Sequence, residues 1–423
     1  PTAIGHPQVE GDAAFGLAVE LTLDGGPTDA ALTDTLTRLA HAHRLPIVAT
    51  GAVRCARPTD ARLADVLTST RLVTDLEGAR GHLPPIGRWL RGAQDMALLH
   101  RRSPGAVDVD AELAADLALP LIAPGLPDAN VPEGHTPASW LRELTRQGAT
   151  RRYGTPQEHP RAWEVLNHEL EVIESLGFPG YFLIVQDFIS AAREELGVWV
   201  GPGRGSAAGS VVAYCLGITK INPLKYDLLF ERFLNPDRVN LPDIDTDFDD
   251  DGRGKVLRWV MDKYGHENCA HIITYGTMAT KNSIKDVARV EKLPIAIANE
   301  LCKAIPDRLP DGMKMNLANA IKCTPQLQDA EVSEDIRERN TIKYARMLEG
   351  TVRNTGIHAC GFIICRNPID DWVPVSTATD PDFPEKKVPV TQYDGHVIES
   401  TGLIKMDFLG LKTLSELKEA CRV

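Results

Sequence analysis

The chain has 423 residues, of which 43% are hydrophobic and 25% charged, and its formal net charge is −12 at pH 7. This composition is typical of a globular protein of roughly two to four domains. The sequence contains no run of about 18 apolar residues, and its first residues lack the pattern of a signal peptide, so we expect a cytoplasmic protein without a membrane partner. The negative charge disfavours a protein that coats nucleic acid by bulk charge, although a local basic groove remains compatible with it.

Cysteine and lysine usage adds two constraints. The eight cysteines are scattered without a CxxC pair, which disfavours a zinc ribbon or a disulfide framework. No lysine precedes Lys220, and arginine supplies the basic side chains before it. We therefore hypothesise that the chain joins segments of two ancestries near residues 200 to 220.

The first half of the chain predicts a strand, several helices and a glycine-rich turn. Residues 43–53 (HRLPIVATGAV) have the pattern of a buried strand, and a helix is expected near Ala61–Leu67. Three segments between about residues 138 and 196 carry apolar residues three and four apart, which predicts helices. A short strand at Val198–Val200 should lead into the glycine-rich turn Gly201–Ser210.

The second half predicts another mixture of strands and helices. We expect an acidic strand over Leu241–Phe248, then a helix over residues 254–265. Residues 276–350 predict a helical subdomain, and strand patterns return at residues 358–365, 386–394 and 401–410. The layout therefore predicts a mixed α/β fold that a helical segment interrupts.

The glycine-rich turn GPGRGSAAGS is typical of a phosphate-binding loop. Glycines let the backbone approach a phosphate, and the N-terminus of the following helix offers N–H groups and a positive dipole end. Arg204, between two glycines, adds a guanidinium suited to phosphate. One alternative is a tight turn that only admits helix packing. Another is a dinucleotide-binding turn, formed by Gly203, Gly205 and Ala208, with Asp227 about 20 residues further on.

The stretch LPDIDTDFDDDG (241–252) places five aspartates at alternate positions: Asp243, Asp245, Asp247, Asp249 and Asp251. An extended chain would put these like charges on one face, where they repel unless a partner neutralises them. A calcium loop of the EF-hand type fails because Arg258 stands where the twelfth ligand should be Glu. The remaining alternatives are a solvated edge strand and a two-metal phosphoryl-transfer site. For the metal site, the later segment IKMDFLG offers Asp407, preceded by Lys405.

Seven motifs, in this order, make the pattern specific: GFPGYFLIV (177–185), GPGRGSAAGS (201–210), LLFERFLNP (228–236), PDIDTDF (242–248), ITYGTMA (273–279), RNTGIHACG (353–361) and IKMDFLGL (404–411). Together they resemble the α subunit of bacterial DNA polymerase III, that is, the C-family replicative polymerases and their error-prone relatives. The resemblance covers about residues 135 to 423.

This resemblance implies a nucleotidyltransferase palm of the DNA polymerase β type with an inserted helical thumb, preceded by a partial PHP α/β domain. The implied boundaries are a PHP-like segment at 1–105, palm at 106–275 and 352–423, and thumb at 276–351. In the segment that resembles the end of a PHP domain, Ala52 and Arg54 stand where ligands would sit. We therefore expect no metal site there.

The resemblance also implies roles for individual residues. It assigns the catalytic metals, two Mg²⁺ or alternatively Mn²⁺, to Asp243, Asp245 and Asp407. Asp247 is not one of these ligands, but it lies on the same face of the strand, and we interpret it as supporting them. It places the triphosphate of an incoming nucleotide at Gly203, Arg204, Gly205, Ser206, Arg232 and Lys405. His358 is equally compatible with a contact near the primer terminus and with a structural role.

The implied activity is DNA-directed DNA polymerisation, in replication or in synthesis across damage, with primer-template DNA and dNTPs as substrates. Lysines of the thumb, Lys281, Lys285, Lys292 and Lys303, are candidates for gripping DNA, or form a solvated face. A sliding clamp and other replisome subunits are the implied partners of a full-length protein. The alternatives are a non-catalytic, nucleotide-binding remnant or chimeric fragment and, on the glycines alone, an oxidoreductase.

Overall fold

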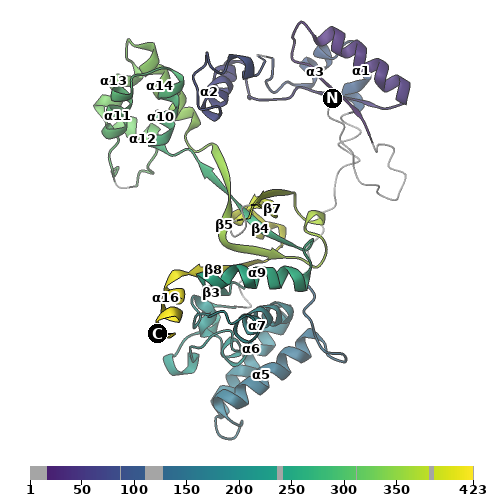
Figure 1. Ribbon diagram of the computed structural model, residues 1–423, viewed down its shortest axis with the longest axis vertical. Helices are drawn as coiled ribbons and strands as arrows, with labels where there is room; N and C mark the ends of the chain where they lie inside the picture. Colours follow the sequence, from purple (N-terminus) through teal and green to yellow (C-terminus); the bar gives the residue numbers. More distant parts are fainter. Residues whose placement is uncertain are drawn as a thin grey trace. The chain divides into compact units, whose positions relative to one another are not determined.

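The computed structural model describes residues 17–85, 87–109, 127–235, 242–310, 312–380 and 385–422. The chain is of the mixed α/β class and forms two compact units, each from two segments distant in sequence (Figure 1). One unit combines Pro1–Leu121 with Thr277–Arg353, and the other combines Ile122–Gly276 with Asn354–Val423.

The first unit begins with a small parallel pair of strands. β1 (Val19–Thr22) pairs with β2 (Ile47–Thr50), and α1 (Asp29–His43) connects them. The strand predicted within residues 43–53 is therefore confirmed as β2. Short elements follow: η1 (Pro58–Asp60), α2 (Ala61–Arg71), η2 (Arg80–His82) and α3 (Ala93–Leu99).

The second segment of this unit is helical, as predicted for residues 276–350. Its helices are α10 (Thr280–Val290), α11 (Ile295–Ala304), α12 (Leu317–Cys323), α13 (Pro325–Glu331) and α14 (Ile336–Leu348). Their apolar faces form one core, which Val66 of α2 joins. Lys292, a candidate DNA contact, instead reaches Asp75 at 3.4 Å and Glu77 at 3.0 Å. This lysine therefore helps to fasten the N-terminal segment to the helices.

The second unit opens with the three predicted helices, α5 (Pro137–Tyr153), α6 (Pro160–Ser175) and α7 (Pro179–Glu194). Each starts with proline, whose missing N–H costs nothing in the first turn, and Thr136 and Ser139 form a reciprocal cap on α5. Among the described residues, no single helix has the length and apolar character to cross a membrane. By length and composition, α6 and α7 could do so only as a pair, but they bend by 112° at their junction.

A glycine-rich segment follows α7. It contains η3 (Ser206–Gly209), α8 (Val211–Cys215), η4 (Pro223–Tyr226) and η5 (Phe230–Arg232). The predicted strand at Val198–Val200 is reduced to one bridge between Val200 and Phe248. Two backbone bonds form this bridge, from Asp249 N–H to Trp199 O and from Gly201 N–H to Asp247 O. The Trp199 N–H instead donates to the Asp249 carboxylate, so the pairing does not continue.

Six strands form the sheet of this unit, in the order β3, β8, β5, β4, β7, β6. They are β3 (Asp245–Asp249), β8 (Lys405–Leu411), β5 (Val352–Ile364), β4 (Cys269–Thr277), β7 (Lys387–Asp394) and β6 (Val375–Thr379). β3 and β8 run parallel, whereas β5 is antiparallel to β8. The remaining elements are α9 (Asp250–Tyr264), η6 (Ile369–Asp371), α15 (Gly395–Ile398), η7 (Glu399–Thr401) and α16 (Lys412–Ala420).

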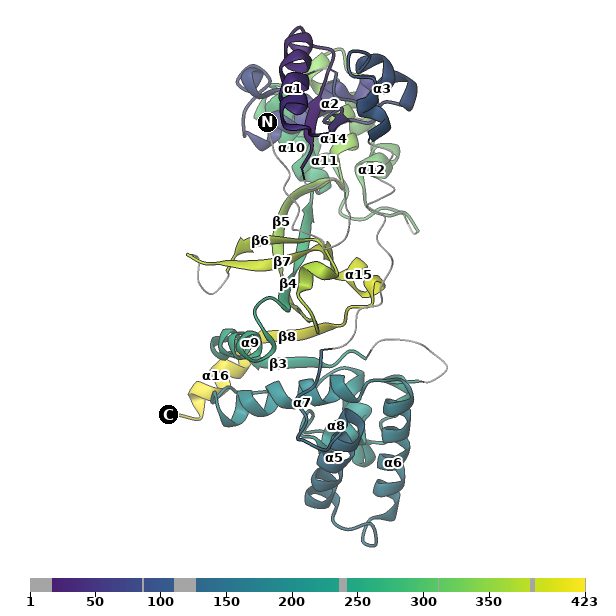
Figure 2. The ribbon, with the colours of Figure 1, turned by 90° about the vertical axis from the view of Figure 1, so that its right-hand side faces the viewer.

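Aromatic packing fixes which face of β3 and β8 is buried. Phe248 of β3 stacks on Phe408 of β8 with ring centroids 5.7 Å apart, and Phe188 of α7 lies 4.7 Å from Phe408. All three side chains are fully buried, and both views show α7 near these strands (Figure 2). Because side chains alternate along a strand, the neighbouring aspartates must point to the other face. Of the expected acidic strand, Leu241 lies outside the described residues. The observed strand begins only at Asp245, so residues 242–244 are not part of it, and it ends one residue later than predicted.

Candidate metal and nucleotide site

Three predicted metal ligands come together at β3 and β8. The parallel register places Asp245 directly opposite Asp407, and Asp243 lies two residues before Asp245. One oxygen of each carboxylate lies within 4.8 Å of one oxygen of each of the others. Residues 162 positions apart in sequence thus form one acidic cluster.

Burial and mutual repulsion disfavour the charged forms of two carboxylates in the cluster. The pKa of Asp245 is raised, first by burial and then by the negative charge of Asp243. The pKa of Asp243 is also raised, by desolvation and by Asp407, although Lys405 opposes the shift. Both shifts indicate a site that favours added positive charge.

Arg204 supplies part of that charge. Its Nη2 donates to Asp245 Oδ1 at 2.9 Å, and its Nε donates to Asp247 Oδ1 at 3.1 Å. The sequence suggested a phosphate partner for this arginine, whereas the structure pairs it with two carboxylates. The Arg204 side chain is 43% exposed, so it is free to exchange one anionic partner for another.

The turn that carries Arg204 needs its two flanking glycines. Gly203 and Gly205 have φ of +98° and +67°, a region that residues with a Cβ avoid. A Cβ on Gly203 would lie 2.7 Å from Thr219 Cγ2, and one on Gly205 would lie 3.1 Å from Asp245 Oδ2. These glycines let the turn approach the acidic strand closely. Arg204, Gly205 and Ser206 are all exposed there.

The helix after the turn does not offer the free N–H groups that the sequence suggested. Its first donors are occupied: Glu169 of α6 accepts from Val211 N at 2.9 Å and Val212 N at 3.0 Å. Ser210 Oγ donates to the same carboxylate at 2.7 Å. Burial raises the pKa of Glu169 to about 7 in spite of these bonds. The N–H groups at the start of α8 therefore anchor the turn to α6 and are not available to a phosphate.

Lys405 and Arg232, the two predicted phosphate contacts outside the glycine-rich turn, differ in their surroundings. Lys405 Nζ lies 3.1 Å from Asp407 Oδ2, so the lysine belongs to the cluster. Partial burial is the largest single effect on the pKa of Lys405 and lowers it. The attractions of the neighbouring groups, Asp407 before Asp243, together outweigh burial, so the pKa of Lys405 is raised. Arg232 ends η5, which packs against η3 of the turn. Its side chain is exposed, and we find no ion pair for it among the described residues.

A divalent cation fits the donor set of the cluster. Asp407 is only 5% exposed, and its Oδ1 is buried without a hydrogen-bond partner. A buried, unpaired carboxylate oxygen is costly unless a cation or donor satisfies it. Three carboxylates form the all-oxygen set that Mg²⁺ and Mn²⁺ prefer.

Two groups beside the cluster were not assigned from the sequence. His358 Nδ1 accepts from Gly361 N at 2.8 Å, and Cys360 Sγ lies 3.6 Å from the same nitrogen. Burial and then the charge of Asp407 raise the pKa of Cys360 to about 11. The arrangement could not be read from spacing because β5 pairs with β8 only from Gly361 to Ile363.

Supporting residues were also missed. Tyr181 is fully buried, and its hydroxyl accepts from Ile244 N at 3.0 Å, which fixes the segment between Asp243 and Asp245. Lys418 of α16 donates to the buried Asp249 at 2.9 Å. Asp249 is therefore not part of the metal cluster but closes the end of β3.

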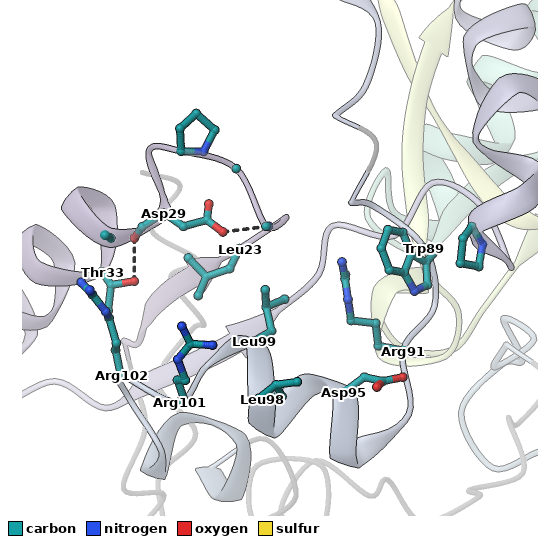
Figure 3. A pocket seen from close by; sticks show the side chains of 15 residues that line it. Leu23, Asp29, Thr33, Trp89, Arg91, Asp95, Leu98, Leu99, Arg101 and Arg102 are labelled. Carbon is teal, nitrogen blue, oxygen red and sulfur yellow. Dashed lines mark hydrogen bonds between the residues drawn. The ribbon is translucent and has the colours of Figure 1, made fainter.

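A cavity of about 720 Å³ lies in the other unit, between the β1–α1 connection and α3 (Figure 3). Arginines and leucines line much of it, including Arg91, Arg101 and Arg102, and the Arg91 guanidinium lies 4.1 Å from the Trp89 ring centroid. None of the residues predicted to bind metal or nucleotide lines this cavity. We therefore take the carboxylate cluster as the candidate site.

Comparison with known proteins gives a consistent family. Residues 139–410 match the model of the bacterial DNA polymerase III alpha NTPase domain. The chain is 39% identical to a DNA polymerase III subunit alpha of Thermus aquaticus over 98% of its residues. It is 38% identical to the corresponding subunit of Caulobacter vibrioides and to an error-prone DNA polymerase of Mycolicibacterium paratuberculosis, each over 96% of its residues.

These matches cover only part of each relative. The chain spans 38% of the Thermus protein and 35% of each of the other two. It therefore corresponds to about a third of their length. The matched third includes every residue of the carboxylate cluster and of the glycine-rich turn.

Proposed function

Because the chain belongs to the bacterial DNA polymerase III alpha family, we propose that it carries the catalytic core of a DNA-directed DNA polymerase. The reaction would be template-dependent transfer of a nucleotide from a dNTP to the 3′-hydroxyl of a DNA primer. The observation that carries this proposal is the meeting of Asp243, Asp245 and Asp407 in one cluster next to the Arg204 turn.

In this proposal the unit that contains the six-stranded sheet is the palm. The helices α10 to α14 are the thumb, and the segment before residue 106 is the end of a PHP domain. What supports the palm assignment is that the two sequence segments that carry the aspartates adjoin within one sheet. Sequence distance alone gives no reason for that pairing.

Two divalent cations, Mg²⁺ or Mn²⁺, would be held by the three aspartates. When bound, they would lower the pKa of the primer hydroxyl and neutralise the departing pyrophosphate. The protein's own contribution is positional. The buried Phe248 and Phe408 fix the face on which the carboxylates stand, and Tyr181 holds the backbone between two of them.

The basic residues would act on the triphosphate. Arg204 would leave Asp245 and Asp247 and bind phosphate oxygens, because its exposed guanidinium suits bidentate contacts with either anion. Gly203, Gly205 and Ser206 would provide the close backbone approach, and Arg232 and Lys405 would offset charge on the leaving group. Lys405 is already held beside Asp407.

The substrates and partners follow from the same proposal. Primer-template DNA would pair with the incoming dNTP, and Lys281, Lys285 and Lys303 remain candidates for contacts with the DNA backbone. A sliding clamp and further replisome subunits would bind the full-length protein. Both replicative and error-prone polymerases occur among the relatives, so the role would be replication or synthesis across damage.

A primer-extension assay with Mg²⁺ tests the proposal. It should use a version of the chain that carries the remaining parts found in the relatives, and should compare it with Asp243→Asn. We expect extension by the wild type and a loss of at least about 100-fold in the variant, because one ligand of the metal cluster is gone. Equal extension rates would refute the metal assignment, and circular dichroism would verify that the variant is folded.

A further inference from the structure

A second set of potential ligands overlaps the carboxylate triad, and its chemistry is different. His358, Cys360 and Asp407 each offer one donor atom, and these three atoms lie within 4.8 Å of one another. The set contains nitrogen, sulfur and oxygen, whereas the triad offers oxygen alone. Thiolate and imidazole select softer cations than Mg²⁺.

The separation of the nitrogen and sulfur atoms matches a zinc centre. His358 Nδ1 lies 3.6 Å from Cys360 Sγ. Bond lengths of about 2.0–2.1 Å for zinc to nitrogen and about 2.3 Å for zinc to sulfur, at a tetrahedral angle, place these atoms about 3.6 Å apart. The nitrogen–sulfur separation is therefore compatible with one shared ion.

The imidazole of His358 is held at Nδ1 by two backbone N–H groups. His358 Nδ1 accepts N–H groups from Gly361 at 2.8 Å and Cys360 at 3.3 Å, which requires an unprotonated Nδ1. A Cβ on Gly361 would lie 3.0 Å from that nitrogen, so the absence of a side chain there leaves room for the ring. A cation at Nδ1 would replace these two N–H contacts with one metal–nitrogen bond.

Asp407 supplies an oxygen that the protein leaves unpaired. Lys405 lies 3.1 Å from Oδ2, but Oδ1 is buried without a hydrogen-bond partner, and the residue is only 5% exposed. An aspartate this deeply buried needs a donor or a cation at its second oxygen. This orphaned oxygen is an observation independent of the cysteine.

We propose that His358, Cys360 and Asp407 form a binding site for a borderline-soft divalent cation such as Zn²⁺. On binding, the Cys360 S–H proton passes to water and a sulfur–metal bond forms. Thiolate and carboxylate then balance the charge of the ion. Because Asp407 belongs to both sets, zinc competes with the oxygen-preferring cations of the triad for this carboxylate. Zinc therefore inhibits nucleotidyl transfer, a consequence that rests on the proposed function, whereas the binding site itself does not.

Cobalt titration of this chain tests the binding site. Co²⁺ substitutes for Zn²⁺ and gives a near-ultraviolet charge-transfer band only when a thiolate is a ligand. We expect one equivalent of Co²⁺ to produce this band in the wild type and Zn²⁺ to remove it. Absence of the band in the folded wild-type chain would overturn the proposal.

Matched variants identify the ligands. Cys360→Ser should abolish the band, and His358→Gln should weaken Co²⁺ binding by at least about 10-fold. Cys323→Ser and Cys421→Ser remove exposed cysteines, and Asp243→Asn removes a carboxylate of the triad only, so the band should persist in all three. A band that survives Cys360→Ser but disappears with Cys323→Ser or Cys421→Ser would place the site elsewhere and refute the proposal. A second variant, Cys360→Ala, guards against a folding defect specific to serine.

Displacement of Mn²⁺ tests the sharing of Asp407 and separates the two proposals. Electron paramagnetic resonance reports free Mn²⁺, so it measures binding to the triad without any activity assay. Zn²⁺ should displace bound Mn²⁺ from the wild type at concentrations at least about 10-fold lower than from Cys360→Ser. Equal displacement in both proteins would refute the shared ligand. A wild type that shows the cobalt band but binds no Mn²⁺ would refute the metal site of the proposed function and leave the zinc site standing.

Discussion

Arg204 Nη2 lies 2.9 Å from Asp245 Oδ1, so the glycine-rich turn is fastened to the acidic strand by an ion pair. The same guanidinium reaches Asp247. In this state the arginine takes the place of a cation beside the carboxylates. If divalent cations and a triphosphate bind, the cations would pair with Asp245 and the triphosphate with Arg204. Each residue would then gain a new partner of opposite charge.

Replacement of Arg204 by alanine should lower stability only when divalent cations are absent. The variant leaves Asp245 and Asp247 without their shared cation, but the arginine is 43% exposed, so we expect a loss of about 1 kcal/mol or less. Urea unfolding with and without Mg²⁺ measures this. Arg232→Ala is the matched control, since that exposed arginine forms no ion pair among the described residues. An equal loss with and without Mg²⁺ would contradict the account.

Asp245→Asn should stabilise the cation-free protein at neutral pH. Because the folded-state pKa is raised above its ordinary value of 3.8, the stability that Asp245 contributes is complete below that value and is lost as pH rises. Asparagine removes the charge, so its advantage should shrink as the pH approaches 4. The variant should also lose the stabilisation by Mg²⁺. Thermal unfolding between pH 4 and pH 7.5 checks both effects, and a variant less stable than the wild type at pH 7 would oppose this prediction.

Glu169 should make the stability of the protein depend on pH. Its pKa of about 7 exceeds the ordinary value of 4.5, so its contribution is complete below about pH 4.5 and disappears above about pH 7. The shift corresponds to about 3 kcal/mol for this fully buried group. Glu169→Gln cannot titrate, so the stability difference between wild type and variant should change across this window. A constant difference would show that hydrogen bonds from the start of α8 outweigh burial.

His271 also makes the stability of the protein depend on pH, so the effect of Glu169 has to be measured as a difference between the wild type and a variant. Burial lowers the pKa of this histidine to about 4. Its contribution is therefore complete above its ordinary value of 6.5 and is lost as pH falls, which is the opposite slope in the same window. In the wild type alone, the opposite pH dependences of Glu169 and His271 would partly cancel. Both proteins contain His271, so its contribution cancels in the difference in stability between the wild type and Glu169→Gln.

Gly205→Ala should damage nucleotide binding more than its effect on stability suggests. Gly205 has φ of +67° and ψ of −157°, a region that is essentially restricted to glycine, so alanine should cost about 1–3 kcal/mol there. The new Cβ would also lie 3.1 Å from Asp245 Oδ2. Gly197→Ala is the matched control, because Gly197 has φ of +62° but no atom near its Cβ position. Both variants should lose stability, and only Gly205→Ala should weaken binding of a fluorescent dATP analogue. Equal weakening by both variants would argue against the turn as the phosphate site.

Much of the fold could be predicted because its local patterns are strong. The helices α5, α6 and α7 follow from apolar spacing and an initial proline. The prediction of a strand at Val198–Val200 was wrong because the side chain of Asp249, far along the chain, accepts the backbone N–H of Trp199. Pairing between β3 and β8 could not be read from spacing either, since it joins segments 162 residues apart.

The candidate site likewise has features that could be predicted from the sequence and features that could not. Motifs identified the three aspartates and Arg204, but the ion pair between Arg204 and Asp245 depends on how the turn packs. Glu169 left a usable signal: it falls between Leu166 and Leu170 on the buried face of α6, where an unpaired carboxylate would not be tolerated. Cys360 left none, because its contact with His358 arises from local folding of β5.

The central claim is that Asp243, Asp245 and Asp407 bind divalent cations together with a nucleotide. Titration of this chain with Mn²⁺, followed by electron paramagnetic resonance with and without dATP, tests it most directly. We predict that the wild type binds Mn²⁺, that dATP increases the number of bound ions, and that Asp407→Asn abolishes both effects. A folded wild type that binds no Mn²⁺, or an Asp407→Asn variant that binds it equally well, would contradict the account.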